Sequence, residues 1–275
     1  MSAESTATTT GIDFSPRRSL KSFLQSSEAS RNMGLGSVLW NNGSVVWQDT
    51  RIELPKESKA EYIQTGYTDH TFHNVVAPHL ENIRLARDIL GIFPISAVQF
   101  RDTEVTEEIV DKGTRIIRRV LPMMTYEPNN KTVVITRKSL KSSLLKVRGA
   151  FFDEVGHRIF DGFTISDKDQ LLSKQSWQIQ TATGTRTATV SDLDAQYKLH
   201  VDPDPAQFDM IARWSMPDSS SANQHSTYSR TSPFEMVAVV VSKNYCEIVD
   251  YIDRKQLKGT AGQRPVIQFI LDNML

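Results

Sequence analysis

The chain has 275 residues, of which 39% are hydrophobic, and this is enough to bury one large core without disulfides. Its 32 basic and 32 acidic residues cancel, so the net charge alone gives no reason to expect nucleic acid or an anionic membrane as a partner. Cys246 is the only cysteine, which excludes an intrachain disulfide and a thiolate-rich zinc site and favours a reducing, intracellular location. The polar start does not resemble a signal peptide, and no apolar run predicts a transmembrane segment.

Residues 1–36 are predicted to form a flexible arm. Its first part is rich in Ser and Thr and too polar to pack, so we expect it to be disordered. Ser15-Pro16 then favours the start of a short amphipathic helix. The apolar stripe of this helix is too narrow to be stable alone, so we expect it to dock on its own domain or on another subunit. The residues predicted to support self-association into a homo-oligomer are Leu20, Phe23 and Leu24.

Residues 37–275 are predicted to form a single β-rich domain. An Asn-Gly turn within residues 37–47 indicates a hairpin, and the patterns at residues 78–91 and 104–112 favour helices. Beyond residue 114 short apolar runs at hairpin spacing predict strands at 115–124, 132–136, 143–152, 158–165, 177–183, 186–190, 197–201, 208–214, 236–246 and 266–271.

The expected fold class is mainly β (α+β), an antiparallel β-sandwich or barrel with a few short helices. In this interpretation the segment from Glu154 to His157 is a turn between two strands. No βαβ alternation is sustained and no Gly-x-x-x-x-Gly-Lys loop is present, which argues against a doubly wound nucleotide-binding fold.

Candidate catalytic and metal-binding residues form no complete set in the sequence. His70, His73 and His79 lie near Asp69, but none of the specific zinc signatures accompanies them. Cys246 follows an apolar run and is predicted to be a buried, inert thiol within a strand. No catalytic residue, metal or cofactor is predicted, and a non-enzymatic protein is expected.

The middle of the chain is strongly basic. On strands, side chains alternate between the two faces of a sheet, so these basic residues are expected to line one solvated face. Such a face binds phosphates through charge alone, without sequence specificity. The residues predicted to bind RNA or another anion are Arg115, Arg118, Arg119, Arg137, Lys138, Lys141, Lys146 and Arg148.

A Ser/Thr-rich arm, a short amphipathic helix and a β-sandwich with one basic face resemble, in architecture, the coat, matrix and movement proteins of RNA viruses. The arm departs from many coat proteins because its only basic residues are Arg17, Arg18 and Lys21. The resemblance implies a self-associating structural protein that binds RNA or an anionic membrane surface in the cytoplasm of an infected host cell. The alternative is an enzyme or small-ligand-binding protein on a β-barrel or sandwich, with His70, His73 or His157 in a pocket.

Overall fold

The fold is dominated by helices, and the predicted sandwich or barrel is wrong. The computed structural model describes residues 38–41, 44–47, 50–53, 77–100, 104–111, 114–140, 142–181, 183–201, 213–216, 231–255 and 262–273. Within these ranges many more residues are in helices than in strands. No two of the described sheets pack face to face as a sandwich, and none closes into a barrel.

The largest sheet is mixed and has the strand order β1-β2-β3-β4-β8-β7. Its strands are β1 (Val38–Asn41), β2 (Ser44–Trp47), β3 (Thr50–Glu53), β4 (Ala97–Phe100), β8 (Thr132–Ile135) and β7 (Met124–Glu127). The pairs β3–β4 and β4–β8 are parallel, and all other pairs are antiparallel. Helix α5 (Ala77–Ile92) makes the crossover that the parallel pair β3–β4 needs. Among the described strands, β7 lies at the end of this sheet and pairs only with β8.

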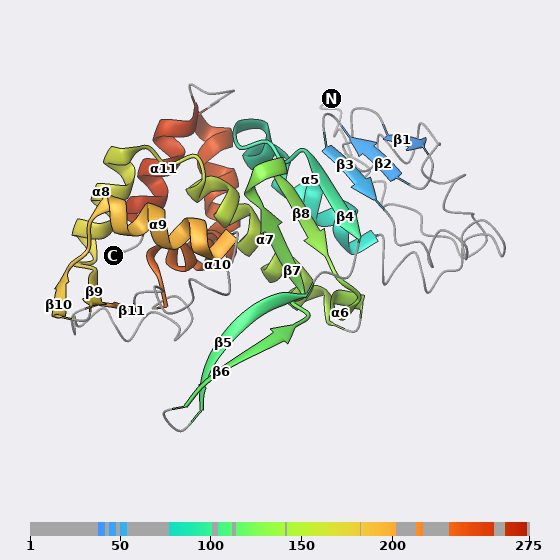
Figure 1. Ribbon diagram of the computed structural model, residues 1–275. Helices are drawn as coiled ribbons and strands as arrows, with labels where there is room; N and C mark the ends of the chain where they lie inside the picture. Colours follow the sequence, from blue (N-terminus) through green and yellow to red (C-terminus); the bar gives the residue numbers. More distant parts are fainter. Residues whose placement is uncertain are drawn as a thin grey trace.

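Helix α7 (Leu144–Phe160) lies between this sheet and a group of helices, as Figure 1 shows. Those helices are α8 (Ile165–Lys174), α9 (Val190–Val201), α10 (Pro233–Lys255) and α11 (Gln263–Asp272). Helix α7 packs most extensively on α10. It buries a row of residues four apart, Val147, Phe151, Val155 and Ile159, each at most 3% exposed.

Two smaller sheets complete the described structure. A long hairpin of β5 (Val105–Asp111) and β6 (Thr114–Val120) extends away from the body of the molecule (Figure 1). The other small sheet has the order β10-β9-β11 and consists of β9 (Gln178–Thr181), β10 (Gly184–Thr187) and β11 (Arg213–Ser215). The short turns η2 (Pro128–Asn130) and α6 (Arg137–Leu140) flank β8.

Several predicted elements are confirmed. The hairpin at residues 37–47 corresponds to β1 and β2, and the helix at 78–91 corresponds to α5. The strand at 132–136 is β8, and the strands at 177–183 and 186–190 correspond closely to β9 and β10.

Other predicted elements are wrong. Residues 143–152, 158–165, 197–201, 236–246 and 266–271, all predicted as strands, lie in or border α7 to α11. Residues 104–112, predicted as a helix, form β5 instead. The predicted turn at residues 154–157 is helical and lies inside α7.

The physical reason for these errors is burial on more than one side. Helix α10 buries residues on several of its faces, so its sequence has no narrow apolar stripe of helical period. Its run of Val residues, which favour strands, therefore led to the prediction of a strand. Cys246 is consequently on a helix, and it is exposed rather than buried.

Several predictions concern parts of the chain outside the described residues. These include the whole arm at residues 1–36, with Leu20, Phe23 and Leu24, and the histidines His70 and His73. Among the helices that the structure describes, none combines the length and the apolar character needed to cross a membrane.

Candidate metal centre

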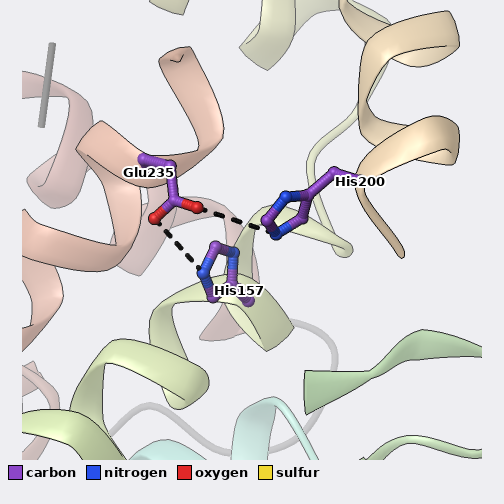
Figure 2. Close-up of side chains that lie close together, drawn as sticks. All are labelled: His157, His200 and Glu235. Atoms are coloured by element: carbon purple, nitrogen blue, oxygen red, sulfur yellow. Dashed lines mark ion pairs between the residues drawn. The ribbon is translucent and has the colours of Figure 1, made fainter. Parts of the chain in front are cut away.

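Three helices each contribute one potential metal ligand to a single cluster, which is buried on the side of His157 and Glu235 and open to solvent at His200. Figure 2 shows His157 from α7, His200 from α9 and Glu235 from α10, with one carboxylate oxygen of Glu235 facing each imidazole ring. One ligand atom from each residue can be chosen so that all three lie within 4.8 Å of one another.

Each histidine lies near one oxygen of Glu235. Nε2 of His157 lies 3.6 Å from Oε2 of Glu235, and Nε2 of His200 lies 3.6 Å from Oε1 of Glu235. Both separations are too long for a normal hydrogen bond. Two atoms that each lie ~2.1 Å from a tetrahedral zinc ion are ~3.4 Å apart, close to each of these two distances. The three candidate ligand atoms together lie only within 4.8 Å of one another, so the side chains would have to draw closer to hold one ion.

The close approach of α7 and α10 brings His157 and Glu235 together. A Cβ atom at Gly156 would lie 2.5 Å from the Cα atom of Ala238 on α10. Only glycine therefore allows this spacing between the two helix backbones. His157 follows Gly156 directly, and Glu235 lies one helical turn before Ala238, so the crossing point of the helices sets the site.

Helix α7 also places two acidic residues beside the cluster. Asp153 lies one turn before His157 on the same side of the helix, and Glu154 follows it. Glu154, His157 and Glu235 are all buried, with exposed fractions of 8%, 6% and 5%. Placing two buried acidic groups and the half-buried Asp153 so close together is unfavourable unless a cation or protons neutralise them.

The pKa shifts of the acidic groups show this cost. Burial, and then the charge of Glu235, raises the pKa of Asp153 to about 7. Burial, followed by the charges of Asp153 and Glu235, raises the pKa of Glu154 well above its usual value, while a hydrogen bond from the backbone N–H of Tyr126 opposes that rise.

The two histidines are held in the neutral form that binds metals. Burial lowers the pKa of His157 to about 4, and its Nδ1 has no hydrogen-bond partner among the described residues. Burial also lowers the pKa of His200 to about 4, with His157 adding to the effect and Glu235 opposing it. The His200 side chain keeps 41% of its surface exposed, so solvent moderates this shift and offers access to the cluster.

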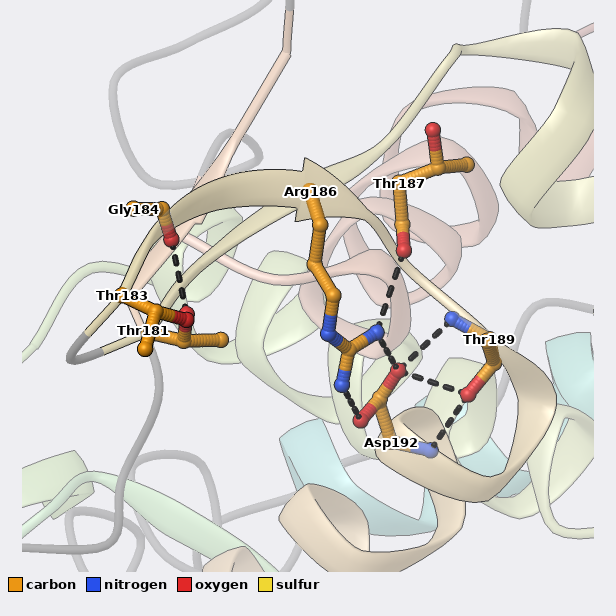
Figure 3. A network of polar contacts seen from close by, with 7 residues as sticks. All are labelled: Thr181, Thr183, Gly184, Arg186, Thr187, Thr189 and Asp192. Atoms are coloured by element: carbon orange, nitrogen blue, oxygen red, sulfur yellow. Dashed lines mark hydrogen bonds and ion pairs between the residues drawn. The ribbon is translucent and has the colours of Figure 1, made fainter.

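The start of α9 is fixed by a polar network that Figure 3 shows. Thr189 and Asp192 form a capping box: Asp192 accepts hydrogen bonds from the N–H and the hydroxyl of Thr189, and Thr189 Oγ1 accepts one from the N–H of Asp192. Arg186 of β10 adds two hydrogen bonds of 2.7 Å to the carboxylate of Asp192. The network holds the helix that carries His200 near its other end.

The structure separates the predicted anion-binding residues onto different elements. Arg115, Arg118 and Arg119 are on β6, where the register places them opposite Val110, Glu107 and Thr106. The remaining five residues lie on α6, on α7 or, for Lys141, outside the described residues, and those five are Arg137, Lys138, Lys141, Lys146 and Arg148.

Part of this basic set does converge. Thr136, just before α6, donates a hydrogen bond from Oγ1 to the carbonyl of Pro122, just after β6, and its N–H donates to the carbonyl of Met123. The end of β6 and the start of α6 are therefore neighbours, and Arg119 and Lys138 are both exposed there. Binding of RNA or anionic lipid by these residues stays a prediction.

Sequence reasoning missed Asp153, Glu154, His200 and Glu235, and it considered His157 only as a pocket residue. One signal was available: Asp153-Glu154-x-x-His157 matches the H-E-x-x-H pattern of zinc metalloproteases with Asp in place of the first His. His200 and Glu235 carry no local signal, because only the packing of α9 and α10 brings them to the site. Comparison of the chain with protein-family models, with curated proteins and with solved structures found no match.

Proposed function

We propose that the chain is a zinc-dependent hydrolase in which His157, His200 and Glu235 hold the metal and Glu154 is the general base. The observation that carries the proposal is the convergence of two imidazoles and a carboxylate from three helices at one point, where His157 and Glu235 are buried and His200 reaches the solvent. Two His and one Glu are a ligand set of catalytic zinc sites, which leave a position open for water. Asp153 lies one helical turn before His157 and is not one of the three converging ligands, but its carboxyl group adds to the negative charge near the site.

The order of groups on α7 supports hydrolysis. In the H-E-x-x-H pattern the Glu beside the first ligand position takes a proton from the attacking water. Glu154 has this position relative to Asp153 and His157, and it is buried near the cluster. A zinc ion bound here would supply Lewis acidity and lower the pKa of its bound water. Glu154 would accept the proton of that water, and the neutral His157 and His200 would keep their lone pairs on the metal.

An extended peptide is the substrate class that the surroundings favour. Among the described strands β7 lies at an edge of the main sheet, and it packs on α7, the helix that carries Glu154 and His157. An edge strand can pair with an added extended chain through backbone hydrogen bonds. Pairing there would hold a peptide bond near the metal and Glu154.

The first test measures zinc binding by the full-length chain after treatment with EDTA. Isothermal titration with zinc chloride should show one tight site, and His157→Ala and Glu235→Gln should each abolish it. The control is the double variant His70→Ala/His73→Ala, which should bind zinc as the wild type does. Zinc binding that depends on His70 and His73, or tight binding by the His157→Ala variant, would contradict the proposed centre.

The second test separates metal binding from catalysis. Glu154→Gln should still bind zinc, but its hydrolysis of quenched-fluorescent peptides should fall by about 100-fold or more, the usual contribution of a general base. Two His and one carboxylate also hold iron(II) in oxygenases. Iron-dependent oxygen consumption with no peptide hydrolysis would replace the hydrolase proposal with that one.

A further inference from the structure

The imidazole of His200 lies against aromatic rings on three helices. Its ring centroid lies 4.7 Å from that of Phe234 on α10 and 5.5 Å from that of His157 on α7. The ring of Tyr197, one helical turn earlier on α9, is stacked on it at 6.4 Å with an interplanar angle of 22°. These separations are in the range of favourable contacts between rings.

Phe234 contacts both imidazoles of the proposed metal centre. Its ring centroid also lies 6.5 Å from that of His157 and 5.4 Å from that of Tyr197. Phe234 and Tyr197 are only 5% and 9% exposed, so packing fixes their rings. The His200 side chain is 41% exposed and lies in the last turn of α9, where a side chain is free to change rotamer unless its neighbours prevent it. The buried rings provide that restraint.

The first turn of α10 fixes Phe234 relative to Glu235. Ser232 precedes the helix, and its Oγ accepts a hydrogen bond of 3.2 Å from the N–H of Glu235, as an N-cap residue does. The carbonyl of Ser232 accepts a second one, of 3.1 Å, from the N–H of Met236. Ser232 is 4% exposed, so solvent does not compete for these bonds. One fixed turn therefore presents a ring and a carboxylate oxygen to His200.

A metal centre needs support of this kind at its histidine ligands. In most metal sites a hydrogen bond to the second ring nitrogen sets the orientation of the imidazole. His157 lacks such a bond, because its Nδ1 has no hydrogen-bond partner among the described residues. Ring packing can set the orientation instead, and a ligand that is already held loses less entropy when the metal binds.

We propose that Phe234 and Tyr197 are positioning residues, which hold the imidazole of His200 so that its Nε2 faces Glu235 and is ready to bind the metal. The inference rests on the proposed function, because it takes His200 as a metal ligand. Phe234 has the larger role, since its ring lies closer to His200 and contacts His157 as well.

The first test measures zinc affinity by titrating zinc chloride into the metal-free full chain. Phe234→Leu keeps an apolar side chain but removes the ring, and zinc should bind about 3- to 10-fold more weakly, the effect of losing one pair of rings.

The matched control for this change is Phe163→Leu. Phe163 is 6% exposed and packs on Phe160 in the same core, but no described ring contact joins it to His200. This variant should lose a similar amount of stability in thermal unfolding and still bind zinc within about twofold of the wild type. Equal weakening of zinc binding in Phe163→Leu and Phe234→Leu would overturn the inference, because damage to the core would then explain both results.

Tyr197 offers a pair of variants that separates the effect of the ring from that of the hydroxyl. The hydroxyl has no hydrogen-bond partner among the described residues, so Tyr197→Phe keeps the ring contact and should bind zinc as the wild type does. Tyr197→Leu removes the ring and should weaken zinc binding by about 2- to 5-fold. This pair decides the question if Phe234→Leu does not fold, and equal zinc affinity in its two members would contradict the inference.

A second measurement needs no metal. In the metal-free wild type, NMR should show nuclear Overhauser contacts from the ring protons of His200 to those of Phe234 and His157, because these rings are close neighbours. In Phe234→Leu the contact between the two imidazoles should weaken, while Phe163→Leu should leave it unchanged. An undiminished contact between the imidazoles in Phe234→Leu would show that Phe234 does not hold His200.

The two measurements distinguish the inference from the proposed function. If the wild type binds no zinc but the contact between the imidazoles depends on Phe234, the hydrolase proposal fails while the support of His200 by Phe234 stands. If the wild type binds zinc through His157 and Glu235 but Phe234→Leu binds it equally well, the metal centre stands and the positioning role is wrong.

Discussion

Gly156 shows how a single residue determines the site. The local sequence, with a glycine between Val155 and His157, predicts a turn at residues 154–157. In the structure the glycine is inside a helix because the backbone of α10 leaves no room for a Cβ atom. Local propensity predicts a turn here, whereas tertiary packing requires a helix. The contact that requires glycine is made by Ala238, more than 80 residues away in the chain.

We expect Gly156→Ala to be destabilising. The new Cβ would meet the Cα and carbonyl atoms of Ala238, which are backbone and cannot move aside as a side chain could. Forcing the helices apart should cost about 1–3 kcal/mol, as overpacked cores do, and should separate His157 from Glu235. Thermal or urea unfolding measures the first effect, and zinc titration measures the second.

The matched control for this change is Gly149→Ala on the same helix. A Cβ at Gly149 would lie 3.7 Å from Oγ of Ser242, which is ordinary contact, so the gain in helix propensity should offset any cost. Equal stability and equal zinc affinity in the Gly156→Ala and Gly149→Ala variants would contradict the role given to the helix crossing.

At the scale of elements, the sequence predicted the sheet better than the helices. The segments that became β1, β2 and β8 are short, contain β-branched residues and are bounded by turn residues, and each was found. Helices α7 and α10 were missed because they are buried between other elements, so that apolar residues occur on several of their faces. A helix with solvent on one side, such as α5, keeps the simple periodic pattern and was predicted correctly.

The capping network of α9 should make stability depend on pH in the acid range. The hydrogen bonds from Arg186 are the largest cause that lowers the pKa of Asp192 to about 2, below the value near 3.8 expected when the chain is unfolded. A lowered pKa means that the folded state favours the charged form of Asp192. The stabilisation of the folded state by this charge is therefore complete above the pKa of the unfolded chain and is lost as the pH falls toward 2.

We therefore expect the difference in melting temperature between the wild type and Asp192→Asn to be constant from pH 7 to about 5 and to shrink between about pH 5 and 2. Ser191→Ala in the same turn is the control, because it removes no titratable group and should give a pH-independent difference. A wild-type advantage over Asp192→Asn that persists unchanged at pH 2 would show that the Asp192 charge does not stabilise the start of α9.

At the scale of the whole molecule, the sequence could indicate a basic region but not its shape. The basic residues, Arg119 and Lys138 among them, are predicted to line one solvated face of a sheet, yet these two lie on a hairpin and a short helix that meet through Thr136. The proposed metal centre could not be predicted from the sequence for a related reason. Its ligands are spread over residues 157–235 and come together only when α7, α9 and α10 pack. Both cases depend on contacts between distant segments, which periodicity and composition do not encode.

The predicted anion binding can be tested independently of the metal centre. Each phosphate that a basic residue neutralises releases counterions, so binding of single-stranded RNA should weaken as salt rises. Arg119→Ala with Lys138→Ala should reduce the slope of log affinity against log salt by about 1–2, close to one unit for each phosphate that the variant no longer neutralises. Both residues are exposed, so the melting temperature should hardly change.

His157→Ala serves as the control, because it removes a proposed zinc ligand but no surface charge, and it should bind RNA as the wild type does. Acidic vesicles tested in parallel would show whether lipid is bound instead; if the wild type binds neither RNA nor vesicles at low salt, these residues are solvated surface charges and the prediction fails.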